Sequence, residues 1–245
     1  MQLARSTSLL AALVLSLAAP VGAQTPASPS GHWDGTVQMG DQTVPISVDL
    51  AKSPTGAWLG SINVPGSTAV DVPLTQITVA DTTVRFNALL EASPLFDAKL
   101  SADATVLSGE ASTAKGSVPF QLKRNGEAHV STPPPSSPLS KAFEGRWDGV
   151  VDVGGKSLRV ALTLARADDG TATGMLISLD QGNTEIPITT VTLHDTALEL
   201  ELRGVSGTYR GTLGAGGEIA GEWAQGPMRA PLNFTHASAD AKKFQ

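Results

Sequence analysis

The chain has 245 residues, a formal net charge of −6, 16% charged residues and no cysteine. Without cysteine no disulfide can form, so the folded state must be held together by packed apolar cores. The acidic residues are dispersed and the sequence has no basic stripe, which argues against nucleic acid as a partner.

Residues 1–23 have the features of a secretory signal peptide. Arg5 supplies positive charge, Leu9 to Ala19 form an apolar run, and Val21-Gly22-Ala23 are the small residues favoured at a cleavage site before Gln24. The run is too short and too rich in alanine for a lasting membrane anchor. Because no cysteine follows it, a lipid-anchored lipoprotein is also excluded. We therefore expect a periplasmic or extracellular protein that is not inserted in the membrane after cleavage.

The rest of the chain contains an internal repeat. Gly31-His32-Trp33-Asp34-Gly35 returns 114 residues later as Gly145-Arg146-Trp147-Asp148-Gly149, and the offset continues without a gap past Pro73 and Pro187. A repeat of this length indicates two copies of one small domain. We expect a lead-in over residues 24–30, a first β-barrel repeat over 31–124, a proline-rich linker over 125–144, a second β-barrel repeat over 145–236 and a tail over 237–245.

Both copies alternate between apolar and polar residues with period two, which is typical of strands with one buried face. In copy one this pattern runs through Val44, Ile46, Val48 and Leu50, and in copy two Leu198, Leu200 and Leu202 alternate with glutamates. Turn-forming residues recur at short intervals, and no segment of useful length shows a helical period. The sequence predicts an all-β protein with two tandem up-and-down meanders of about eight strands, each closing into a small barrel.

The pattern also makes two finer predictions. All four tryptophans (Trp33, Trp58, Trp147 and Trp223) fall on the apolar face of their strands beside a glycine, where an indole can cover the dent that a missing side chain leaves. We therefore expect them in the core, not on a ligand-binding surface. An odd step of three residues, at Leu74 to Ile77 and at Ile188 to Val191, predicts a bulge at the same place in both copies.

Two resemblances follow from these residues. Gly31-His32-Trp33 and Gly145-Arg146-Trp147 resemble the Gly-x-Trp opening strand of calycin barrels, the lipocalins and avidins. That resemblance implies that each tryptophan closes one barrel end, packed by a basic residue from the last strand. Arg124 could supply this residue in copy one, while His236 occupies the matching position in copy two.

The chain is also similar to a secreted bacterial β-rich domain found ahead of serine hydrolases or α/β-hydrolases. The similarity rests on glycines and core residues of both copies, with Gly221-Glu222-Trp223 near the end of the second. In those relatives the activity belongs to the fused hydrolase. The two resemblances imply a structural signature made of Gly31, Trp33, Gly35, Arg124, Gly145, Trp147, Gly149, Gly221, Trp223 and His236.

Candidate catalytic motifs are weak. Ser112-Thr113-Ala114-Lys115 matches Ser-x-x-Lys but bridges two predicted strands, where a helix is required. Gly204-Val205-Ser206-Gly207 lacks the fifth-position glycine and the helix of a nucleophile elbow. The paired aspartates Asp34 and Asp148 suit strand ends, and Asp168-Asp169-Gly170 suits a hairpin turn. No histidine has a neighbour at metal-ligand spacing. The sequence therefore predicts no catalytic residue, cofactor or metal.

The leading hypothesis is a secreted, non-catalytic binding or accessory module. Its partner would be a small apolar ligand in the barrel mouth opposite the Gly-x-Trp end, or another protein. A hydrolase-associated or weakly hydrolytic enzyme is one alternative. A structural envelope protein, with the linker as a spacer, is the other.

Overall fold

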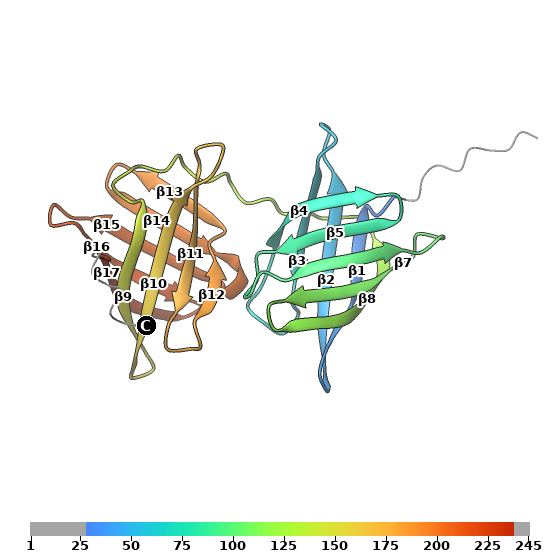
Figure 1. Cartoon of the computed structure of the whole chain (residues 1–245), viewed down its shortest axis with the longest axis horizontal. Coiled ribbons are helices and arrows are strands. Elements are labelled where there is room, and N and C mark those ends of the chain that lie inside the picture. The colour runs from blue at the N-terminus through green and yellow to red at the C-terminus, as the bar shows by residue number, and fades with distance from the viewer. Residues whose placement is uncertain (1–27, 238–245) are drawn as a thin grey trace, which may run out of the picture.

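The computed structural model describes residues 28–237 and consists of two β-units that follow one another along the chain (Figure 1). The predicted signal peptide lies outside the described residues, as do residues 24–27 and 238–245. Within residues 28–237 the only helix is a short 3₁₀ turn, η1 (Arg203–Val205), and no helix is long and apolar enough to cross a bilayer. The predicted fold class, all-β with two tandem barrel-like units, is confirmed.

The first unit is a closed barrel of eight antiparallel strands in sequence order. Each strand pairs with the next, and the last strand returns to pair with the first, where Trp33 lies opposite Arg124. The strands are β1 (Gly31–Met39), β2 (Gln42–Lys52), β3 (Trp58–Asn63), β4 (Val72–Ala80), β5 (Thr83–Ala88), β6 (Leu95–Leu100), β7 (Val106–Thr113) and β8 (Gly116–Gly126).

The second unit is a nine-stranded sheet that curls in the same way but is not closed by strand pairing. Its order is β12-β11-β10-β9-β17-β16-β15-β14-β13, so β12 and β13 form its two edges. The strands are β9 (Gly145–Val153), β10 (Lys156–Arg166), β11 (Ala172–Ser178), β12 (Thr184–Pro187), β13 (Thr190–His194), β14 (Ala197–Leu202), β15 (Gly207–Leu213), β16 (Glu218–Gln225) and β17 (Met228–His236).

The period-two pattern correctly predicts which residues face the interior. Ile46, Val48 and Leu50 are buried on β2, and every second residue of β14 from Leu198 to Leu202 is at most 2% exposed. Three tryptophans are buried in the cores as expected. Trp58 is only partly buried; it packs on the rim of the first core, with Nζ of Lys52 5.9 Å from its ring centroid.

The odd step in the pattern has a different outcome in each unit. In the first unit the pairing of β4 with β5 shifts register between Thr75 and Thr78, and Gln76 adopts a left-handed backbone with φ of 51°. This is the predicted bulge. In the second unit the equivalent strand is broken into β12 and β13, and the break opens the seam of the barrel.

Part of the predicted linker fills this seam. The Ser137 N–H donates to the carbonyl of Val191 on β13 (2.8 Å), and the Ser137 carbonyl accepts from Ala172 N–H on β11 (2.8 Å). The hydroxyls of Ser136 and Ser137 accept from the N–H groups of Val191 and Leu193. Figure 1 shows this segment crossing from the first unit and passing β13. Residues 136–139 thus supply partners that unpaired strand edges need.

Gly35 and Gly149 are required by the close approach of two strands. A Cβ on Gly35 would overlap the Gln121 carbonyl oxygen, and one on Gly149 would lie 2.8 Å from that of Asn233. The predicted reason, a dent covered by the neighbouring tryptophan, is therefore wrong at these two positions. Contact between the last and first strands explains them.

Leu139 tests whether the seam-filling segment belongs to the second core. Its side chain is 2% exposed and packs in that core although the residue lies in the predicted linker. We expect Leu139→Ala to lower the free energy of unfolding of the second unit by about 2–5 kcal/mol, because it leaves a cavity. The measurement is urea denaturation of the full chain, monitored by tryptophan fluorescence.

The matched control is the exposed neighbour Ser140→Ala, which should change stability by less than about 0.5 kcal/mol. Equal stabilities of the Leu139→Ala variant and the unmodified chain would contradict the assignment of this segment to the core.

Candidate functional site

The first barrel is covered at one end by Trp33 and Arg124. Trp33 is fully buried, and its indole N–H donates to the carbonyl of Pro29 (2.9 Å). The Arg124 guanidinium lies 4.5 Å from the indole centroid, a cation–π geometry, and also donates to the backbone carbonyls of Ser30 and Ala104. Burial lowers the pKa of Arg124 from its ordinary value. This end of the barrel is therefore filled by side chains.

The second unit has the same arrangement with different side chains. The Trp147 indole donates to the carbonyl of Phe143 (2.9 Å), again four residues back, and His236 lies edge-on to it with ring centroids 4.7 Å apart. Nε2 of His236 is 3.3 Å from the carbonyl oxygen of Glu144, the residue equivalent to Ser30. His236 thus takes the place that Arg124 has in the first unit.

The signature glycines make room for these contacts. Gly31 and Gly145 have φ of 153° and 114°, which only glycine adopts readily. A Cβ on Gly31 would be 2.8 Å from Nη1 of Arg124, and one on Gly145 would be 3.1 Å from Nε2 of His236. The remaining two signature residues also pack in the second unit: Trp223 is 7% exposed and lies against Gly207, and Gly221 faces the backbone of β15.

The interiors are occupied by protein side chains. In the first unit Phe86 stacks on Phe96 at 4.9 Å, and Phe96 meets Phe120 edge-on at 5.2 Å. In the second, Tyr209 meets Phe234 at 5.2 Å, and burial raises the pKa of Tyr209 well above its ordinary value. Phe86 and Phe234 have no accessible surface, so no water-sized void lies beside them. These aromatic clusters leave no space next to them for an apolar ligand.

The candidate catalytic groups are not brought together. Ser112 bonds to the Ser117 hydroxyl (2.6 Å) across the β7–β8 hairpin, and Ser206 donates to the carbonyl of Thr68. Asp34 and Asp148 each bond within their own unit. Over residues 28–237, no three histidine, aspartate or glutamate side chains are grouped to hold a metal ion.

A charged cluster beside Trp33 was missed by the sequence patterns. Nδ1 of His32 lies 2.9 Å from Oδ1 of Asp49, and Nε2 lies 3.2 Å from Oδ1 of Asp34. Asp49 is 3% exposed although it occupies an outward position on β2, and it also accepts from the backbone N–H of His129 (2.8 Å). The segment after β8 therefore covers this carboxylate. With an acid at each ring nitrogen, the doubly protonated imidazolium is the form that satisfies both.

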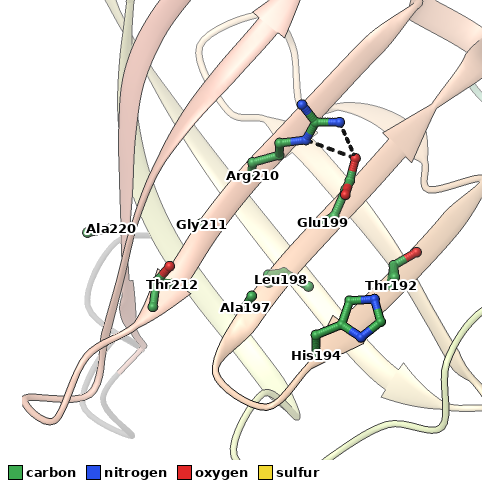
Figure 2. Close-up of a pocket in the computed structure, with 9 residues that line it drawn as sticks. All are labelled: Thr192, His194, Ala197, Leu198, Glu199, Arg210, Gly211, Thr212 and Ala220. Atoms are coloured by element: carbon green, nitrogen blue, oxygen red, sulfur yellow. Dashed lines mark hydrogen bonds and ion pairs between the residues drawn. The ribbon is translucent and has the colours of Figure 1, made fainter.

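The shallow hollow in Figure 2 lies on the outer face of β13 to β16 and has a volume of about 260 Å³. Its floor is made of small residues such as Ala197 and Thr212, and the charged side chains beside it are Glu199 and Arg210, whose Oε1 and Nη2 atoms are 2.6 Å apart. The first unit has an ion pair at the equivalent strand position with the signs exchanged, Arg85 on β5 and Asp97 on β6. A pair that occurs with either polarity is typical of cross-strand stabilisation.

The two units contact each other through equivalent surfaces. On one side, Arg203 of η1 donates from Nη1 to the Asp71 carbonyl (3.1 Å). On the other side, Ala92 in the loop after β5 donates its backbone N–H to the Glu185 carbonyl (3.4 Å). Asp71 and Glu185 are equivalent in the repeat, and the loops that contact them follow equivalent strands. The contact therefore has the pattern of an isologous dimer interface within one chain.

A cavity of about 360 Å³ opens on one side of this contact. Its lining comes from the first unit, the linker and the second unit: Val70, Asp71, Ser131, Glu201, Arg203, Ser206, Gly207 and Thr208. Nε of Arg203 lies 3.0 Å from Oε1 of Glu201, and these side chains are 17% and 36% exposed. Asp71 and Ser206 both have left-handed backbones, with φ of 50° and 47°.

Comparisons with known proteins identify no family for this chain and only distant structural similarity. Neither a family model nor a curated protein matches the chain. A protein from Bacteroides fragilis, provisionally described as an outer-membrane protein, is 13% identical with a TM-score of 0.27, covering 84% of this chain and 95% of its own. A protein of unknown function from Nostoc punctiforme has 9% identity, coverage of 85% and 96%, and a TM-score of 0.26. The apo haemoglobin receptor HpuA from Kingella denitrificans has 12% identity, coverage of 89% and 91%, and a TM-score of 0.23. TM-scores this low carry no argument about function.

The His32 cluster predicts a pH-dependent stability. The hydrogen bond to Asp49 raises the pKa of His32 above its ordinary value of 6.5. Because the pKa of His32 is higher in the folded chain than in the unfolded chain, protonated His32 stabilises the fold fully at a pH below its unfolded-state pKa. This stabilisation is lost as the pH rises through its folded-state pKa. We expect the urea midpoint of the first unit to fall as the pH is raised from about 6 to about 9.

His32→Gln should flatten this dependence, while the exposed His194→Gln of the second unit should leave it unchanged. The same slope in the unmodified chain and in His32→Gln would exclude His32 as its source.

Proposed function

We propose that the protein is a secreted, non-catalytic binding protein whose ligand or partner engages the cavity between the two units. The observation that supports this proposal is that the cavity is lined by residues of both units and of the linker, and that a half-buried ion pair lies in its wall. Its volume falls in the range of small-molecule sites. A ligand there would be held by groups that neither unit supplies alone.

The alternatives have less support in the structure. An apolar ligand would need open space that the aromatic clusters of the interiors do not leave beside them. A serine hydrolase needs a base within hydrogen-bond reach of its nucleophile. Ser112 and Ser206 instead bond to another hydroxyl and to a backbone carbonyl.

Thr208 and Thr212 offer a matched test, because both lie on the outer face of β15. Thr208 borders the inter-unit cavity and Thr212 borders the hollow of Figure 2. Native and denatured masses are measured for the protein recovered from its own secretory compartment. We expect a discrete bound mass in the unmodified protein and in Thr212→Trp, and its loss in Thr208→Trp, whose indole fills the cavity.

Two results would contradict the proposal. One is a bound mass that Thr208→Trp retains, and the other is an unmodified protein whose native and denatured masses are equal. The denatured mass also tests the predicted removal of residues 1–23 on secretion.

A further inference from the structure

We infer that the inter-unit cavity recognises an organic primary ammonium group carried on an aliphatic chain. This inference rests on the proposed function and specifies the chemistry of its ligand. It follows from the charges of the cavity, from the hydrogen-bonding groups that remain free, and from a comparison of the two sides of the inter-unit contact.

The charged groups of the cavity leave an excess of one negative charge. Arg203 is held in place, because Nε bonds to Glu201 and Nη1 donates to the Asp71 carbonyl. Its charge is therefore balanced by Glu201. The Asp71 carboxylate makes no hydrogen bond or ion pair with any other residue in the range 28–237, although its backbone N–H bonds to Asn63. A cation is the ligand that this carboxylate favours.

The lining residues also offer hydrogen-bond acceptors, beside the N–H groups of Arg203 that its contacts with Glu201 and Asp71 do not use. Besides Asp71, the lining residues include Glu201, which carries a carboxylate, and Ser131 and Thr208, whose hydroxyls can accept hydrogen bonds. Ser206 donates its proton to the Thr68 carbonyl, which leaves its oxygen lone pairs for an incoming donor. An ammonium group has three donors and no acceptor, so it matches this set.

The cation that fits is organic. Hard metal ions such as Ca²⁺ take six to eight oxygen ligands, and no metal-holding group of acids and histidines occurs within residues 28–237. Val70, also in the lining, is 55% exposed and offers an apolar contact. An alkyl chain ending in an ammonium group can use both features, as the side chain of lysine does.

The repeat supplies an internal control for these charges. On the opposite side of the contact, the positions equivalent to Glu201 and Arg203 are Asn87 and Leu89. That side still docks, through Ala92 and Glu185. Docking on that side thus proceeds without an ion pair, so the Glu201–Arg203 pair is more than docking of the units requires.

The test is an NMR titration of the ¹⁵N-labelled chain, residues 24–245, with three probes. Nα-acetyl-lysine-N-methylamide and 1,5-diaminopentane carry the ammonium, and Nα-acetyl-norleucine-N-methylamide has the same chain without it. We expect saturable shifts at the amides of Asp71 and Thr208 with the two amines only. Tighter binding of the lysine amide indicates a lysine side chain of a partner, and tighter binding of the diamine indicates a free small amine.

Asp71→Asn should weaken amine binding at least tenfold, since asparagine keeps the left-handed backbone but removes the charge. Asp81→Asn is the matched control, because Asp81 is exposed, lies in the same unit and has a similar φ of 53°. Equal shifts with the norleucine amide, no saturable shift with either amine, or unchanged binding by Asp71→Asn would each overturn the inference. A bound mass lost in Thr208→Trp would then leave the proposed function standing with a different ligand.

Discussion

One hydrogen bond is made in the same way in both units and ties the incoming chain to the end of each sheet. The indole N–H of Trp33 or Trp147 donates to the carbonyl four residues back, which draws the incoming chain across the barrel end. A basic side chain from the last strand then covers the indole and reaches the same incoming segment. First strand, last strand and lead-in are thereby joined at one point. Arg124 covers the indole in the first unit and His236 covers it in the second. The position beside the indole therefore requires a flat side chain that donates hydrogen bonds more than it requires a fixed charge.

The sequence patterns predicted those features of the fold that depend on periodicity within a strand, namely which residues are buried and where a strand is irregular. They placed the leucines of β14 inside, and they located the irregularity in β4. They could not predict contacts made by the connecting chain, because those have no period. Asp49 illustrates this limit. Alternation places it in solvent, but its carboxylate is buried, bonded to the ring of His32 and to the backbone N–H of His129 from the segment after β8. The seam of the second unit and the cavity between the units were missed for the same reason.

Comparison of the two copies separates residues that maintain the fold from those that differ for another reason. The outer ion pair keeps its position on the sheet and exchanges its signs, Arg85 with Asp97 and Glu199 with Arg210. Where the second copy has Arg203, by contrast, the first has Leu89, and the strands around both are alike. A requirement of the fold would act on both copies. Arg203, present in one copy alone, is therefore not required by the fold of a single unit; it acts at the contact between the units, where it donates to the Asp71 carbonyl.

The linker contacts both units and the cavity between them. Residues 136–139 fill the seam of the second unit by bonding to β13 on one side and β11 on the other, while Ser131, a few residues earlier, lines the cavity. The backbone of His129, earlier still, bonds to Asp49 of the first unit. One short segment is thus anchored in each unit and borders the space between them. A ligand that contacts Asp71, Ser131 and Thr208 together binds the docked arrangement of the units more tightly than a separated one, and so stabilises it.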